Sequence, residues 1–113
     1  MEARATAKFI RMSPQKARLV VDLIRGKSAG EAINILRFTK KRAAHEIEKV
    51  LHSAISNAEQ KSENLDVDRL VIAQAYINEG SRTKRIRPAP QGRAYRYQRR
   101  TSHITLVVED AQG

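Results

Sequence analysis

The residues best suited to binding chemistry are eight arginines and lysines in residues 81–100, a stretch without aspartate or glutamate. A guanidinium group forms paired hydrogen bonds with a phosphate, and an ammonium group pairs with it as a point charge. Tyr95 and Tyr97 lie among these cations and can stack on unpaired bases. The eight cations are Arg82, Lys84, Arg85, Arg87, Arg93, Arg96, Arg99 and Arg100. This composition predicts that the stretch binds nucleic acid through its phosphates.

The remaining charge is distributed unevenly along the 113 residues, whose net charge is +10. Residues 1–21 carry a net charge of +4, residues 22–80 are neutral, and the last thirteen residues carry −2. A surface adapted only for solubility intersperses both signs, as the middle of this chain does. The N-terminal excess therefore predicts a second basic patch on the body of the protein. Its members are Arg4, Lys8, Arg11, Lys16 and Arg18.

The sequence contains few residue patterns that are typical of catalytic or metal-binding sites. Cysteine is absent, which excludes disulfides and zinc–thiolate sites. His45 and His52 are seven residues apart, whereas helical metal-binding pairs are spaced by three or four. Glu46 and Glu48 have no apolar surroundings that would separate their pKa values, and no glycine-rich phosphate loop occurs. We therefore expect no enzyme activity, catalytic residue, metal or cofactor.

Length and hydropathy indicate one domain without a membrane span. Domains of about 100–150 residues are the commonest size. No apolar run approaches the roughly 18–20 residues that cross a bilayer, and the N-terminus lacks a signal-peptide pattern. We expect a cytoplasmic protein with no membrane partner.

Three strands are predicted to form the sheet of the body. Residues 3–10 alternate between apolar and polar side chains, which is typical of a strand with one buried face. Ala3, Ala5, Ala7 and Phe9 are expected on that buried face, with Arg4, Thr6 and Lys8 on the other. Residues 70–77 and 104–108 are rich in apolar and β-branched residues and predict two further strands.

Three helices are predicted between the first two strands. The first begins at Ser13 and Pro14 and ends at Gly26, and the second opens with a capping box formed by Ser28 and Glu31. The third covers about residues 40–61 and has the strongest helical periodicity. The apolar residues at helical spacing are Ala17, Val20, Val21 and Ile24 in the first helix and Ala43, Ile47, Val50, Leu51, Ala54 and Ala58 in the third. The fold class is therefore α+β.

About 25 residues separate the last two predicted strands, more than an ordinary loop contains. We interpret them as a hairpin arm, residues 79–102, that continues the two antiparallel strands and turns near residues 88–92. Ten residues per leg at about 3.3 Å each give a reach of roughly 30 Å. The whole chain, 1–113, is then one domain whose body comprises residues 1–78 and 103–113.

Two DNA-binding alternatives can be compared with this interpretation. A helix-turn-helix needs polar side chains on its second helix to read bases, whereas the second helix here is rich in alanine, isoleucine and leucine. A dimeric architectural DNA-binding protein with β-arms remains as an alternative. A stable homodimer in the absence of nucleic acid would favour it.

The sequence resembles the bacterial-type family of ribosomal protein twenty-two of the large subunit. The similarity covers nearly the whole chain in the same order. The motifs that carry it are Arg11-x-Ser13-Pro14-x-Lys16-x-Arg18-Leu19-Val20-x-Asp22-Leu23-Ile24-Arg25-Gly26-Lys27, Asn57-Ala58, Glu79-Gly80, Lys84-Arg85, Gly92-Arg93-Ala94 and Arg99-Arg100-Thr101-Ser102-His103-Ile104-Thr105.

The resemblance implies three helices packed on a three-stranded antiparallel sheet, with a long β-hairpin arm that lines the polypeptide exit tunnel. It implies a structural constituent of the large ribosomal subunit that binds ribosomal RNA and aids its assembly. The implied partners are large-subunit ribosomal RNA, neighbouring large-subunit ribosomal proteins and the nascent polypeptide near the arm tip, with no homo-oligomer. The implied location is the cytoplasmic ribosome.

The resemblance also adds His103 to the RNA-binding residues and defines a tunnel tip. The tip residues are Arg87, Pro88, Ala89, Pro90, Gln91, Gly92 and Arg93. The family tip usually reads Pro-Arg-Ala-x-Gly-Arg-Ala. Ala89 and Pro90 depart from this pattern, so this chain has one tip arginine fewer and one proline more.

Overall fold

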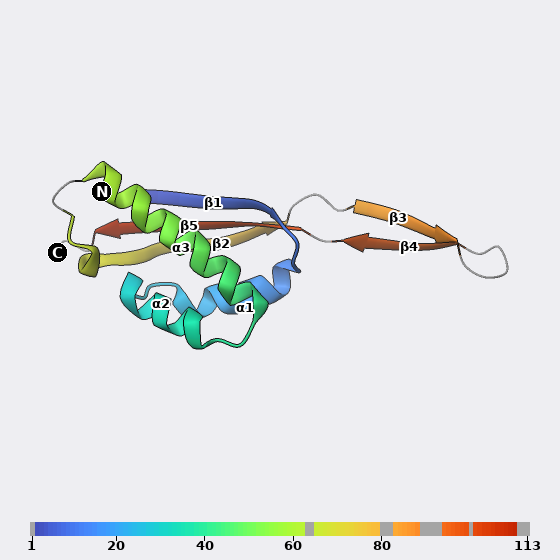
Figure 1. The fold of residues 1–113 in the computed structure, drawn as a ribbon, viewed down its shortest axis with the longest axis horizontal. Coiled ribbons are helices and arrows are strands. Elements are labelled where there is room, and N and C mark those ends of the chain that lie inside the picture. The colour runs from blue at the N-terminus through green and yellow to red at the C-terminus, as the bar shows by residue number, and fades with distance from the viewer. Residues whose placement is uncertain (1, 63–64, 80–82, 89–93, 100, 111–113) are drawn as a thin grey trace.

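The chain folds into three helices and two antiparallel sheets (Figure 1). A computed structural model describes residues 2–62, 65–79, 83–88, 94–99 and 101–110. The elements in order are β1 (Glu2–Ile10), α1 (Pro14–Ile24), α2 (Ala29–Phe38), α3 (Arg42–Lys61), a 3-10 turn (Val67–Arg69), β2 (Leu70–Glu79), β3 (Thr83–Pro88), β4 (Ala94–Arg99) and β5 (Ser102–Asp110). The predicted α+β class and the order of its elements are confirmed.

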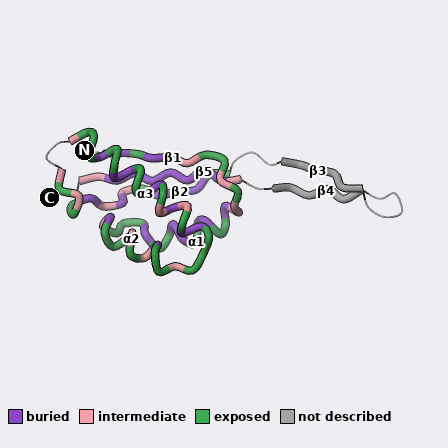
Figure 2. The backbone as a smooth tube through the Cα atoms, in the orientation of Figure 1, coloured by how far each residue is buried: buried purple, intermediate pink, exposed green. Residues whose placement is uncertain are grey.

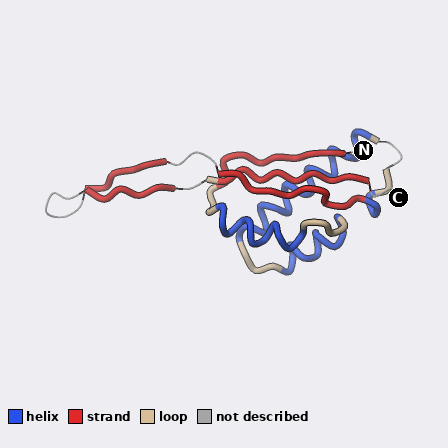
Figure 3. The backbone as a smooth tube through the Cα atoms, turned by 180° about the vertical axis from the view of Figure 1, so that it is seen from behind, coloured by secondary structure: helices blue, strands red, loops and turns tan. Residues whose placement is uncertain are grey.

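The body is built on a three-stranded antiparallel sheet in the order β1-β5-β2. The last strand of the chain thus lies between the first strand and β2, and its register with β2 runs from Leu70 opposite Asp110 to Glu79 opposite Ser102. α3 crosses one face of this sheet, and α1 and α2 pack beside it (Figures 1 and 3). Among the described residues, no helix covers the other face of the sheet (Figures 1 and 3).

The core lies between the sheet and the helices. All ten apolar residues at the predicted helical spacing are buried, as expected. The central strand β5 is buried along most of its length (Figure 2). Even Val107, on the face without helices, is only 1% exposed. Its neighbours in register are Arg4 and Gln74, whose long side chains can cover it from both sides.

The helix ends follow the local sequence. The hydroxyl of Ser28 accepts a hydrogen bond from the Glu31 N–H at 3.3 Å, as a capping residue does. Ser13 occupies the N-cap position of α1 without a side-chain cap bond. Gly26 follows the end of α1 with a φ of 79°, the left-handed conformation that glycine adopts without steric cost.

The prediction that Phe9 faces the core is wrong. The register between β1 and β5 shifts between Ala7 and Ile10, and Phe9 has a φ of 59° and is 58% exposed. A one-residue irregularity reverses the face on which the following side chains lie. The Phe9 N–H donates to Nδ1 of His103 at 3.1 Å, and the two rings meet edge to face with centroids 4.8 Å apart.

The arm contains a separate two-stranded sheet. β3 and β4 pair from Thr83 opposite Arg99 to Pro88 opposite Ala94. They lie beyond the end of the body sheet at which Glu79 and Ser102 pair (Figure 1). The molecule is 66 Å long but only 26 and 17 Å in its other dimensions. The tip positions 89–93, like Arg82 and Arg100, lie outside the described residues.

The two glycines at helix ends allow a matched test of backbone conformation. We expect Gly26→Ala to lower the free energy of unfolding by about 1–2 kcal/mol, because alanine is strained at positive φ. A Cβ at position 26 meets no atom within 4 Å outside its chain neighbours. The loss would therefore come from the local backbone conformation and not from a clash with another element. Gly30→Ala, inside α2 and equally free of clashes, should stabilise by about 0.5–1 kcal/mol. Urea unfolding of both variants measures the difference, and an equal effect at both sites would contradict this explanation.

Candidate nucleic-acid interface

The arm brings its arginines and tyrosines into cross-strand register. Arg85 lies opposite Tyr97, and Arg87 lies opposite Tyr95. Antiparallel pairing therefore places a phosphate-binding residue type opposite a base-stacking residue type at two positions of the hairpin. No acidic residue occurs in residues 81–100. The hairpin therefore combines cationic and aromatic residue types in a segment that has no acids.

The five predicted N-terminal cations lie on β1, on α1 and on the turn between them. Arg4 and Lys8 are exposed on β1, at positions that alternate with the buried Ala3 and Ala5. Arg4 lies opposite Val107 and so on the sheet face that the described helices leave uncovered, whereas Lys8 falls in the register shift between Ala7 and Ile10. The other three cations, Arg11, Lys16 and Arg18, lie at or near α1 and are treated below.

Arg11 and Lys16 line a groove of about 550 Å³ between the start of α1 and the start of α3. We call this site the basic groove. Its lining residues are Arg11, Met12, Ser13, Lys16, Leu19, Lys41, Arg42 and Ala43. Lys41 and Arg42 were not predicted as binding residues, because they belong to the electrically neutral middle of the chain. The run Lys40-Lys41-Arg42 is the local signal that could have revealed them.

Residues 22–80 have no net charge, but their acids and bases are unevenly placed in the fold. Four of its acids pair with cations outside the groove, at N–O distances between 2.7 and 3.9 Å. These pairs are Asp22–Arg25, Glu48–Arg37, Glu46–Lys49 and Asp66–Arg69. In the described part of the chain, none of the four groove cations forms an ion pair. The described acidic residues therefore leave the positive charge at the groove unneutralised.

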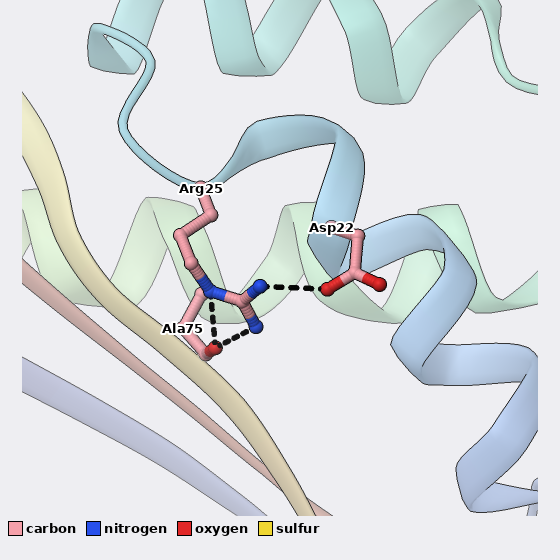
Figure 4. Close-up of polar contacts among 3 residues, drawn as sticks. All are labelled: Asp22, Arg25 and Ala75. Carbon is pink, nitrogen blue, oxygen red and sulfur yellow. Dashed lines mark hydrogen bonds and ion pairs between the residues drawn. The ribbon is translucent and has the colours of Figure 1, made fainter.

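Arg18 and the nearby Arg25 have a structural role at the free edge of β2. Nη2 of Arg18 donates to the carbonyl oxygen of Ile77 at 3.1 Å. Nε and Nη2 of Arg25 donate to the carbonyl oxygen of Ala75 at 3.2 and 2.7 Å, and its Nη1 contacts Asp22 at 2.7 Å (Figure 4). Arg18 is exposed and keeps further N–H donors, so it remains a proposed RNA contact in addition to this role.

The histidines differ in their surroundings. His45 and His52 are exposed on α3, whereas His103 is half-buried beside Phe9. Because Nδ1 of His103 accepts the Phe9 N–H, the hydrogen of the neutral ring is on Nε2, which is left to donate elsewhere. Among the described residues, no group of three or more His, Asp or Glu side chains is placed to hold a metal ion. No helix in the described ranges is long and apolar enough to cross a membrane.

The fold and surface define an α+β protein with a strongly basic hairpin arm. The chain matches the family model described as ribosomal protein L22p/L17e over residues 5–109, and it belongs to that family. "Large ribosomal subunit protein uL22" of Solibacter usitatus is 60% identical over 113 residues, covering 100% of both chains. The protein of the same name in Clostridium novyi is 56% identical over 110 residues, covering 97% of this chain and 98% of its own. The one in Koribacter versatilis is 53% identical over 117 residues, covering 100% of this chain and 70% of its own.

Family membership confirms several expectations from the sequence. The resemblance to the bacterial-type ribosomal family is correct. The family is a structural, non-enzymatic component of the ribosome, so the expectations of a ribosomal location and of no enzyme activity are also confirmed. Membership favours a ribosomal protein over the dimeric architectural DNA-binding protein.

The contacts of Arg25 generate a prediction about stability. A lysine cannot reproduce the two N–H bonds to the Ala75 carbonyl together with the Asp22 contact, because it lacks the planar fork of a guanidinium. We expect Arg25→Lys to lower the free energy of unfolding by about 1 kcal/mol. Asp22→Asn is the control, since it removes only an exposed ion pair and should cost about 0.5 kcal/mol or less. Equal losses in the two variants, measured by urea unfolding, would show that the Ala75 contacts contribute little.

Proposed function

We propose that this chain is a structural constituent of the large ribosomal subunit that binds ribosomal RNA and aids its assembly. Its arm lines the polypeptide exit tunnel. Its partners are large-subunit ribosomal RNA, neighbouring large-subunit ribosomal proteins and, near the arm tip, the nascent polypeptide. The names of the relatives and membership of the family support the assignment to the large subunit.

The observation that carries RNA binding is the arm itself. β3 and β4 pair only with each other, so among the described strands the body sheet gives them no further partner. The arm has a net charge of +8 over residues 81–100 and few residues that could form a core. Such an isolated, self-repelling hairpin is explained by a polyanion that neutralises it. An arm that enters folded RNA holds several RNA segments together, which explains a role in assembly.

The body would bind RNA through two further surfaces. Arg4 and Lys8 offer exposed cations on β1, and His103 offers Nε2 near the base of the arm. Arg11 and Lys16 offer cations at the basic groove. These contacts fix the orientation of the body, because phosphate contacts position a protein on its RNA without reading its sequence.

The phosphate-binding role of the arm predicts a change in salt dependence. In the arm variant, four arginines are replaced by glutamine: Arg85, Arg87, Arg96 and Arg99. The slope of log affinity against log salt for deproteinised bacterial large-subunit RNA should fall in magnitude by about 3, since each phosphate contributes roughly 0.7–0.9. Filter binding at salt concentrations from about 50 to about 200 mM measures this slope.

A matched variant separates location from total charge. It neutralises four body cations outside the proposed surfaces, namely Lys27, Arg37, Lys49 and Arg69. Its slope should change by less than about 1, because these side chains are not proposed to contact phosphate. If both variants lower the slope equally, RNA binding is a property of net charge and the arm has no special role.

The tunnel-lining role predicts contact with the nascent chain at the tip. A photoreactive amino acid at Gln91 in ribosomes stalled during translation should crosslink to the nascent polypeptide. The same group at His45, exposed on α3 of the body, is the control and should not. Crosslinks from position 91 to RNA alone would contradict the proposed position of the tip.

A further inference from the structure

We infer that the basic groove is a binding site for a single unpaired nucleotide of RNA, with its phosphates on the four groove cations and its base on the apolar floor. This inference rests on the proposed RNA-binding function and names the ligand of one surface of the body. The shape, the apolar lining and the charge of the groove support nucleotide binding at this site.

The floor of the groove is apolar and partly exposed. Leu19 lies two residues after the fully buried Ala17, on the opposite side of α1, and is 58% exposed. Ala43 and Met12 complete the floor. A phosphate alone would have no use for an apolar surface, whereas every base presents a flat π face. The thioether of methionine makes favourable contacts with aromatic rings. A volume of about 550 Å³ falls within the range of small-ligand sites, roughly 300–1,000 Å³.

The rim of the groove is cationic. Arg11, Lys16, Lys41 and Arg42 are all exposed, and no described acid pairs with them. Four like charges around one groove repel each other, so this arrangement costs stability in the free protein. The first turns of α1 and α3, which border the groove, carry no acid, whereas the first turn of α2 carries Glu31. A phosphate diester in the groove removes the repulsion.

The groove is anchored to the base of the arm. The hydroxyl of the fully buried Ser102 donates to the carbonyl oxygen of Met12 at 2.9 Å. Ser102 is paired with Glu79 in β2 at the point where the body sheet ends. α1 begins at the same end of the body from which the arm extends (Figure 1). An RNA strand that follows the arm toward the body therefore reaches the groove without crossing an acidic surface of α1, whose first turn carries no acid.

Neighbouring leucines on α1 provide a matched test in the full-length protein. Leu19 lines the groove, whereas Leu23, one turn later, is 49% exposed and does not. An aspartate in the groove should repel the phosphates, so Leu19→Asp should weaken binding to deproteinised large-subunit RNA by about tenfold or more. Leu23→Asp should weaken it by less than about twofold, as a rim or unrelated charge does. Urea unfolding of both variants verifies that both remain folded.

A crosslinking experiment identifies the occupant. Benzoylphenylalanine at position 19 should crosslink to one unpaired nucleotide, mapped by primer extension, and the same group at position 23 should not. Equal affinity losses for the two aspartate variants would overturn the groove site while leaving arm-dependent RNA binding intact. A crosslink from position 19 of assembled subunits to a protein, or to nucleotides within a continuous duplex, would also overturn it. If neither the groove variant nor the arm variant alters RNA affinity, the proposed function itself fails.

Discussion

The structure depends on how the two free edges of a three-stranded sheet are closed. Such a sheet exposes unpaired carbonyl and N–H groups along β1 and β2, which can template pairing with other chains. Side chains from the helices occupy these edges. On β1, Asn57 and Lys61 of α3 donate to the carbonyl oxygens of Arg4 and Glu2 at 2.8 and 2.9 Å. On β2, the segment after α1 pairs through Gly26 and Lys27 with Ile72, and the arginines of α1 continue along the edge.

This closure allows the protein to carry a long arm on a small body. β5 is held on both sides, by β1 and by β2, up to its first residues near Ser102. The strands that lead into the arm are therefore fixed in direction before the arm begins. Because β3 and β4 form a sheet of their own, the charge repulsion within the arm acts on strands that do not pair with the body sheet. The described body core is thus built from β1, β2, β5 and the three helices.

Local sequence signals were enough to predict the helices and the three body strands. Apolar periodicity and composition indicated the elements, and capping residues such as Ser13 and Ser28 indicated where helices begin. Ala17, Val20 and Ile24 follow a 3.6-residue repeat and are all fully buried, because burial against one partner face imposes that repeat directly. The position of Phe9 could not be predicted in this way. Its orientation depends on a shift in pairing with β5, a strand about 95 residues away, and on the bond to His103. The same limit applies to the groove, where Arg11 and Lys41 meet only through the packing of α1 against α3.

Charge counting failed for a related reason, since it cannot distinguish what a cation contacts. Arg18 and Arg25 are spaced by seven residues, two turns of α1, so both reach the same strand edge and bond to carbonyls two residues apart. Part of the basic N-terminal motif therefore stabilises the sheet. Conversely, the charge count missed Lys41 and Arg42, because acids that pair with other cations cancel their charge in the sum. A net charge of +10 therefore does not tell which cations are left without an acidic partner at each surface of the body.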